Sequence, residues 1–271
     1  MGRKYPLATA ANPAFIRALM NRRTFLAMSI AAAMPAISAE PDTRCFEMRV
    51  YYAAPGKLDE LHKRFRDHTT KLFTKHGMTN LGYWTPAENP ESKLVYVLAY
   101  PDRTARDASW KAFMADADWQ AAYKASEVNG KLVAKVESTY MQATDYSPAI
   151  KATSAAPRVF ELRTYTTTPG NLVNINARFR DHTIKLFAKH GMTNLFYWNL
   201  QPGQPGTDNT LVYLLAHKDA EAMAASFKAF RADVDWVAAK EASEKAAGGS
   251  LTVPDGVKSV LMNATDYSET K

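Results

Sequence analysis

The chain has 271 residues, which is enough for two domains of ordinary size, each able to bury a hydrophobic core. Its formal net charge is +7, but residues 1–39 contain five basic residues and no acidic one, and the remainder has 29 basic residues against 27 acidic ones. A nearly neutral body gives little electrostatic reason to expect a nucleic-acid partner, so we predict none. Cys45 is the only cysteine, which excludes an intramolecular disulfide and a cysteine-based zinc or iron–sulfur site.

Residues 1–39 carry the pattern of an export signal. Arg22 and Arg23 stand before an apolar run rich in Ala and Met, residues 27–36, and a small residue that suits a signal peptidase follows at Ala39. Paired arginines in this position are typical of twin-arginine signals, which direct folded proteins across the inner membrane. The sequence therefore predicts a periplasmic protein without membrane association once the signal is removed.

The sequence alone does not determine where this N-terminal segment starts or where it is cleaved. Met20 stands directly before Asn21, so translation could begin at Met20 instead of Met1. Ile37 leaves the cleavage position undecided. The alternative is an uncleaved N-terminal anchor, although residues 27–36 are too short and too weakly apolar for a stable membrane span.

One segment of the chain occurs twice. Residues 46–84 align with residues 160–198 without a gap, and about 25 of the 39 positions are identical. A repeat of this period, close to the size of one small domain, indicates two copies of one fold rather than a solenoid of short repeats. Between the copies, residues 149–157 are small and bounded by proline, which predicts a linker and domain boundaries at 44–148 and 158–268.

The first copy alternates between strand and helix patterns. Residues 45–53 have a period of two, and a helical period begins at Leu58 after the turn Pro55-Gly56. The second helix is expected to break near residues 116–118, where an aspartate would cap a new helical segment. The expected elements are strand 45–53, helix 58–76, strands 78–85 and 94–100, helix 107–129 with its break, and strand 132–143.

The second copy follows the same order. Its expected elements are strand 159–166, helix 172–190, strands 192–198 and 211–217, helix 220–247 and strand 257–264. The order β-α-β-β-α-β in each copy is that of a ferredoxin-like domain. The predicted fold class is therefore α+β, with two tandem ferredoxin-like domains.

The repeated motifs resemble those of the NIPSNAP family over nearly all of residues 44–268. They are Phe46–Tyr51 and Phe160–Tyr165 before Pro-Gly, His76–Trp84 and His190–Trp198, and Phe113–Trp119 and Phe230–Trp236. The resemblance implies a dimeric α/β barrel, formed here within one chain by two sheets that pack face to face. The family has no agreed chemistry, and its wider superfamily includes cofactor-independent oxygenases, haem-degrading enzymes and small isomerases.

The first strand of each copy has a polar face with the same three residue types. These ligand-binding candidates are Glu47, Arg49 and Tyr51 in the first copy and Glu161, Arg163 and Tyr165 in the second. If the apolar faces of these strands cover the helices, both triplets point into the barrel. In one interpretation the Glu and Arg side chains pair and tie the two sheets together, because buried charges are costly unless they pair. In the other, an Arg or Tyr binds an anionic or oxygenated small ligand.

His68 and His182 are the remaining candidates. The helical period places both on the apolar stripe of the first helix of their copy, where a histidine is commonly a half-buried core residue. No His-x-x-x-His or Glu-x-x-His pattern accompanies them, and no phosphate loop or nucleophile elbow is present, so we predict no metal and no cofactor.

Two classes of function remain from the sequence. The first is an exported protein that binds a small ligand or a partner through the barrel between the two sheets, without catalysis. The second is a cofactor-independent enzyme of the monooxygenase or isomerase type, in which Arg49 or Arg163 orients a substrate and a Tyr or His moves a proton. Whether the chain forms a homo-oligomer is open.

Overall fold

The computed structural model describes residues 1–2, 42–155 and 158–271. The predicted export signal therefore lies outside the described part of the chain, apart from its first two residues. Residues 42–155 and 158–271 belong to one compact unit. Within the described ranges, none of the helices combines the length and the apolar character needed to cross a bilayer.

The first repeat contains four strands, and the helices lie between the first and second strands and between the third and fourth. Its elements are β1 (Cys45–Ala53), α1 (Leu58–Arg64), the π-helical turn η2 (Phe65–Thr69), α2 (Thr70–Lys75), β2 (Thr79–Pro86), β3 (Lys93–Tyr100), α3 (Arg103–Ala115), α4 (Ala117–Ser126) and β4 (Val133–Ala143).

The second repeat has the same order of elements. They are β5 (Val159–Thr167), α5 (Leu172–Arg178), η3 (Phe179–Thr183), α6 (Ile184–Lys189), β6 (Thr193–Leu200), β7 (Thr210–His217), α7 (Ala220–Ala232), α8 (Val234–Ala246) and β8 (Thr252–Ala264). The last strand begins at Thr252 and is thus longer than the predicted strand 257–264.

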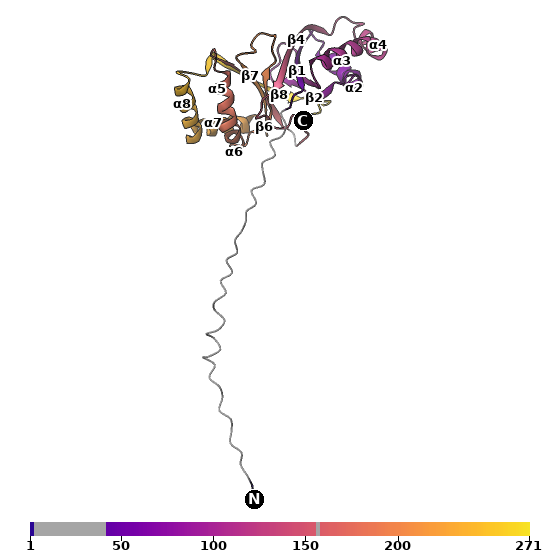
Figure 1. Cartoon of the computed structure of the whole chain (residues 1–271). Helices are drawn as coiled ribbons and strands as arrows, with labels where there is room; N and C mark the ends of the chain where they lie inside the picture. The colour runs from indigo at the N-terminus through magenta and orange to yellow at the C-terminus, as the bar shows by residue number, and fades with distance from the viewer. Residues whose placement is uncertain (3–41, 156–157) are drawn as a thin grey trace. The chain divides into compact units, whose positions relative to one another are not determined.

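The eight strands close into one antiparallel barrel in the order β1-β3-β2-β8-β5-β7-β6-β4. Each repeat contributes four neighbouring strands in the ferredoxin-like order, β4-β1-β3-β2 and β8-β5-β7-β6. Two short contacts join the repeats: β2 pairs with β8, and β4 pairs with β6. Figure 1 shows the helices of each repeat on the outside of its own half of the barrel. The predicted fold, two ferredoxin-like units forming a barrel within one chain, is confirmed.

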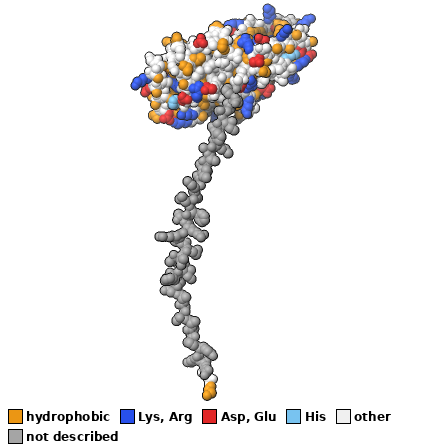
Figure 2. All heavy atoms as spheres, viewed as in Figure 1, with side chains coloured by type: hydrophobic (Ala, Val, Ile, Leu, Met, Phe, Trp, Pro, Cys, Tyr) orange, Lys and Arg blue, Asp and Glu red, His pale blue; other side chains and the backbone are white. Residues whose placement is uncertain are grey.

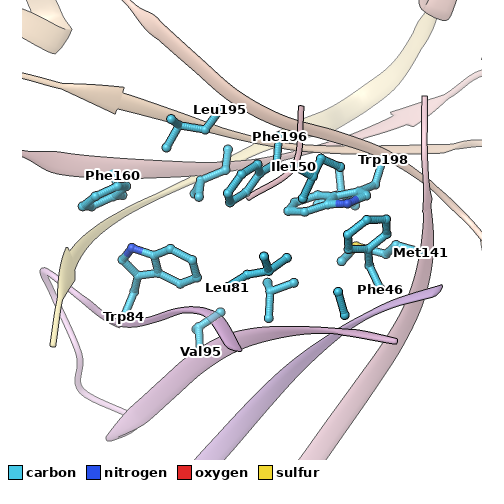
Figure 3. Packing of buried hydrophobic residues seen from close by; sticks show 14 of the residues in the cluster. Phe46, Leu81, Trp84, Val95, Met141, Ile150, Phe160, Leu195, Phe196 and Trp198 are labelled. Carbon is cyan, nitrogen blue, oxygen red and sulfur yellow. The ribbon is translucent and has the colours of Figure 1, made fainter. Parts of the chain in front are cut away.

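The interior of the barrel is an apolar core made by both repeats. In Figure 3, Leu81 and Trp84 of one sheet face Leu195 and Trp198 of the other. Aromatic side chains of the two repeats pack against each other in this core. The ring centres of Trp84 and Phe160 are 5.8 Å apart, and those of Trp198 and Phe46 are 5.9 Å apart. Because these large buried side chains fill the space between the two sheets, the structure does not support the predicted ligand site there.

The prediction that the polar triplets face the barrel interior is wrong. Phe46, Met48 and Val50 of β1 belong to or pack against the interior cluster, so Glu47, Arg49 and Tyr51 point to the opposite face, beneath the helices. The same holds for Glu161, Arg163 and Tyr165 on β5. The physical reason is that the two sheets together exclude water from the barrel interior. The purely apolar face of each first strand is therefore the one that points into the barrel.

The first helix of each repeat contains a π-helical turn that changes which residues face the core. The wider turn inserts an additional residue, so Thr69 is buried, and His68, predicted on the apolar stripe, is exposed. In the second repeat Thr183 is buried and His182 is exposed in the same way. The predicted placement of both histidines in the core is therefore wrong.

The predicted break in the second helix is confirmed. The Asp116 carboxylate caps α4 by accepting hydrogen bonds from the backbone amides of Asp118 at 2.8 Å and Trp119 at 3.2 Å. The second repeat has the same cap. Asp233 separates α7 from α8, and its carboxylate accepts a hydrogen bond from the backbone amide of Asp235 at 2.9 Å. The single helix predicted over 220–247 is thus two helices.

Positive and negative side chains are interspersed on the face of the body seen in Figure 2. This distribution matches the nearly neutral balance of charges outside residues 1–39. The visible face offers no broad region of a single sign that would attract a polyanion by long-range electrostatics.

Candidate functional site

Each repeat has a cavity between the outer face of its sheet and the helices that cover it. The cavity of the first repeat has a volume of about 430 Å³, and that of the second has a volume of about 540 Å³. Both volumes are in the range of small-molecule sites. The main lining residues are Arg49, Tyr51, Arg64, Trp110, Trp119 and Tyr123 in the first and Arg163, Tyr165, Arg178, Phe227, Trp236 and Lys240 in the second.

Strand β1 supplies the floor of the first cavity. Its period of two directs Glu47, Arg49 and Tyr51 to the helix-covered face, where the three side chains form a connected chain. The Arg49 guanidinium donates to Glu47 Oε1 at 2.6 Å and to the Tyr51 hydroxyl at 3.4 Å. Arg49 Nε also donates to the Tyr96 hydroxyl at 3.0 Å. The predicted Glu–Arg pair is therefore present, but it lies within one repeat and does not tie the two sheets together.

Glu47 is fully buried behind the cavity and accepts six hydrogen bonds. Arg106 of α3 donates twice, from Nε at 2.9 Å and from Nη2 at 2.8 Å. The other donors are Arg49, Tyr100, Trp110 and Ser138. Burial alone would raise the pKa of Glu47, but the hydrogen bonds from Arg106 and the charges of Arg49 and Arg106 outweigh it and hold the pKa below the ordinary value of 4.5.

Glu161 occupies the equivalent place in the second repeat with fewer cationic partners. It accepts hydrogen bonds from Arg163 Nη1 at 2.5 Å and from Ser259 Oγ at 2.5 Å, and its Oε2 lies 3.1 Å from His217 Nε2. Burial would again raise its pKa, and the hydrogen bond from His217 together with the charge of Arg163 lowers it below 4.5. The other ring nitrogen of His217, Nδ1, is buried without a hydrogen-bond partner among the described residues.

Two further arginines at equivalent positions line the cavities. Arg64 at the end of α1 is only 4% exposed; its Nη1 donates to Ser126 Oγ at 3.2 Å and lies 3.3 Å from Glu127 Oε1. The guanidinium also lies 5.4 Å from the centre of the Trp119 ring. Arg64 Nε is buried and has no hydrogen-bond partner within the described part of the chain.

Arg178 repeats this arrangement in the second repeat. It is 6% exposed, and its Nη1 donates to Ser243 Oγ at 3.4 Å and lies 3.8 Å from Glu244 Oε1. The central carbon of its guanidinium lies 5.2 Å from the centre of the Trp236 ring. Burial lowers the pKa of Arg178, and its Nε, too, is buried without a partner in the described ranges. A buried N–H group without an acceptor is unfavourable, so each arginine has an unsatisfied donor in the wall of its cavity.

The structure separates the predicted candidates into three groups. Arg49, Tyr51, Arg163 and Tyr165 line the cavities, whereas Glu47 and Glu161 lie beneath them as partners of the arginines. The two triplets are not brought together, because each lies on the outer face of its own sheet. His68 and His182 are exposed and line neither cavity.

Sequence reasoning missed Arg64, Arg178, Arg106 and His217. The first two could have been found, because they are identical in the two copies and lie within the repeated segments 46–84 and 160–198. Arg106 and His217 have no counterpart of the same type in the other copy, so the repeat gave no indication of them.

Within residues 1–2, 42–155 and 158–271, no group of three or more His, Cys, Asp or Glu side chains is arranged to hold a metal ion. The groups that line the cavities include guanidinium donors, tyrosine hydroxyls and aromatic rings, together with the carboxylates of Glu127 in the first cavity and of Glu241 and Glu244 in the second. Such a set suits an anionic or oxygenated ligand with an apolar body, since arginine pairs with carboxylate or a similar anion, and aromatic rings contact the rest.

The fold and its cavities define the class of the protein, an intrachain dimeric α/β barrel in which each ferredoxin-like repeat has its own cavity between sheet and helices. A model of the NIPSNAP family matches residues 46–148 and 160–249, and the chain belongs to this family. The comparison with curated proteins gave no match.

Several solved structures are similar to this chain at low sequence identity. An uncharacterized NIPSNAP domain protein from Burkholderia xenovorans is 27% identical, over 38% of this chain and 98% of that chain, with a TM-score of 0.34. A protein from Fusobacterium nucleatum whose name proposes monooxygenase activity is 12% identical, over 84% of this chain and 95% of that chain, with a TM-score of 0.53. Another from Lactobacillus acidophilus, similarly named, is 10% identical over the same shares, with a TM-score of 0.51. The last two similarities show the fold alone.

Proposed function

We propose that this NIPSNAP protein binds small anions with an apolar or aromatic body, one in the cavity of each repeat between the sheet and the helices. The observation that carries the proposal is the pair Arg64 and Arg178. Each is a buried arginine at the same place in its repeat, each lines a cavity, and the Nε of each is buried without a hydrogen-bond partner among the described residues.

The energetics of these arginines support a ligand site. A buried guanidinium is costly unless its donors are satisfied, and neither Arg64 nor Arg178 is satisfied by Glu127 or Glu244 alone. A carboxylate or sulfonate in the cavity would accept hydrogen bonds from the guanidinium and replace water that the apolar walls hold poorly. The aromatic rings of Trp119 and Trp236 lie beside the guanidinium groups and would contact the body of the ligand.

The test uses native mass spectrometry and calorimetry on the exported protein purified from the periplasm. A bound anion should be released on denaturation, and an added naphthalenesulfonate should occupy two sites. Arg64→Gln and Arg178→Gln should each remove one site, because glutamine is neutral but can still donate to the neighbouring glutamate. Lys71→Gln and Lys185→Gln are matched controls on exposed positions of the same helices and should keep both sites. Unchanged binding by both arginine variants would refute the proposal.

A cofactor-independent enzyme is the second candidate. The observation that favours it is His217, a buried imidazole paired with Glu161 through Nε2, whose Nδ1 has no partner within the described ranges. His217 lies behind Glu161 and does not line the cavity, so it would act on a ligand only through its neighbours. Mass analysis of the ligand before and after aerobic incubation decides between the two. A ligand that is recovered unchanged supports binding alone, whereas a product that disappears in His217→Gln supports catalysis.

Export to the periplasm is part of the proposal. It rests on Arg22 and Arg23 and the Ala-rich run that follows them. Changing both arginines to lysine should leave the precursor in the cytoplasm, and cell fractionation measures this. Normal export of the double variant would argue against a twin-arginine route.

A further inference from the structure

The last strand of each repeat is longer than its contact with the other repeat. β4 spans Val133–Ala143 but pairs with β6 only through residues 141–143. β8 spans Thr252–Ala264 but pairs with β2 only through residues 262–264. Among the described residues, the first part of each strand therefore has a neighbouring strand on one side, β1 or β5, and forms a free sheet edge on the other.

The backbone groups of the β4 edge point outward without partners. The Tyr140 carbonyl accepts a hydrogen bond from the N–H of Gln201, the residue after β6, at 2.9 Å. Because alternate residues of a strand direct their backbone groups to the same side, those of Val136 and Ser138 also point away from β1. In the described part of the chain no hydrogen bond reaches them on that side, and residues 134–138 are all exposed. Such an edge is a template that another strand can extend.

The β8 edge has features that prevent this kind of pairing. Residues 253–256 bulge out of the ladder opposite Thr166 alone. Within the bulge, Pro254 has no backbone N–H, and Asp255 has a positive φ of 54°. Bulges and proline keep an edge strand from pairing with another chain. The irregularity at the corresponding place in β4 is the one residue Ala134, and no proline interrupts that strand.

The sequence of β4 is complementary to itself in an antiparallel pair. If two copies pair with Val136 opposite Val136, Lys135 of each copy lies opposite Glu137 of the other. The two side chains are exposed, at 60% and 46%, and opposite charges at opposed positions stabilise a strand pair. Centring the pair on Glu137 instead would oppose two like charges. The same arrangement of β8, centred on the equivalent Val257, gives Lys258 no acidic residue to face.

We propose that this protein forms a homodimer in which the β4 edges of two copies pair antiparallel about Val136. The pairing supplies partners for the free backbone groups of Val136 and joins the sheets of the two copies across a two-fold axis. Because both copies use the same edge, association stops at two copies. Val136 is 42% exposed and lines the first cavity, so Val136 of the second copy lies beside that cavity. The proposal does not depend on the anion sites.

Sedimentation velocity of the exported protein tests the dimer. The paired stretch is short, so the dimer should be weak, and a monomer–dimer equilibrium should appear at concentrations up to about 1 mM. Lys135→Glu and Glu137→Lys each turn two attractive contacts into repulsive ones and should weaken association at least about tenfold. Both positions are exposed, so neither change should affect folding. The double exchange restores opposite charges and should restore the dimer. A monomer at every concentration, or a dimer of equal strength in all variants, would overturn the proposal.

Cysteine cross-linking tests the register. Residues opposed in a hydrogen-bonded pair have Cα atoms about 5.5 Å apart, which a disulfide can span. Val136→Cys should therefore oxidise to a linked dimer. Val257→Cys is the matched control, because Val257 is the equivalent position of β8 and is also 42% exposed, and it should stay unlinked. Cys45 is buried and should not contribute. Equal cross-linking of the two variants, or none in Val136→Cys, would contradict pairing at β4.

Discussion

Arg66 of the first repeat donates two hydrogen bonds to Asp266 near the end of the second repeat, from Nε at 2.6 Å and from Nη2 at 2.8 Å. The reverse contact has the same geometry, since Arg180 of the second repeat donates to Asp145 at the end of the first, at 2.7 Å from each of the two nitrogens. Each repeat therefore places its last residues on the first helix of the other, and the two repeats interlock.

The tyrosine after each of these aspartates completes the core of the opposite repeat. Tyr267 lies 5.4 Å from Tyr83 and 6.3 Å from Phe65 between ring centres, and its hydroxyl lies 2.7 Å from His62 Nδ1. Tyr146 packs in the same way against Tyr197, at 5.7 Å. Half of the chain alone consequently lacks part of its core.

We predict that Tyr267→Ala lowers the free energy of unfolding by about 3 kcal/mol, because it removes a largely buried aromatic ring from the core of the first repeat. Urea unfolding monitored by tryptophan fluorescence measures the change. Asp266→Ala is the control and should cost less than about 1 kcal/mol, since the ion pair with Arg66 is exposed. An equal loss in both variants would contradict the packing role of Tyr267.

We predict that residues 44–148 expressed alone self-associate or unfold readily. The fragment lacks β8 and Tyr267, and it exposes the apolar sheet face that the second repeat covers. Sedimentation measures its size, and thermal unfolding measures its stability. A stable, soluble monomer would show that the repeats fold independently, contrary to this account.

Arg163→Met should destabilise the protein more than Arg49→Met. Without Arg163, the buried carboxylate of Glu161 keeps only His217 and Ser259, and the expected loss is about 3–5 kcal/mol. Without Arg49, Glu47 still accepts two hydrogen bonds from Arg106, and the loss should be about 1–2 kcal/mol.

Urea unfolding of the two variants decides the point. Glu161→Gln combined with Arg163→Met is the matched control and should regain part of the stability, because it removes the unpaired buried charge. If both arginine variants were harmless, the arginines would be ligand groups rather than structural partners of the carboxylates.

Stability should fall in acid because of Glu47 and Glu161. The pKa of each carboxylate is lowered in the folded state, so its contribution is present above the ordinary value of 4.5 and is lost as the pH falls through the folded pKa. The contribution of these two carboxylates to the free energy of unfolding should be level from about pH 7 to 5 and should decline below about pH 4.5. In Glu47→Gln the decline should be shallower by up to about 1.4 kcal/mol per pH unit, the value for one proton. An identical slope would show that Glu47 is not ionised in the fold.

Much of the fold could be predicted because the evidence for it is local and occurs twice. The period of two at residues 45–53, the turn at Pro55-Gly56 and the cap at Asp116 each determine one element from neighbouring residues. The repetition at residues 160–198 then gave the tandem architecture, and the family motifs indicated the barrel.

The faces of the elements could not be predicted as well, since they depend on what packs against them. Alternation on β1 separates Phe46 from Glu47, but it does not say which side meets the other sheet and which side meets the helices. The π-helical turn that exposes His68 has no clear pattern in the sequence. The partnership of Arg106 with Glu47 joins residues that are 59 positions apart, and only the packing of α3 on the sheet brings them together.

The location of a bound anion tests the central claim most directly. A crystal structure of the protein with naphthalenesulfonate should show one molecule between the sheet and the helices of each repeat, with the sulfonate within hydrogen-bond distance of Arg64 in the first and of Arg178 in the second. A sulfonate inside the barrel among Trp84 and Trp198, or two empty cavities at a saturating concentration, would contradict it.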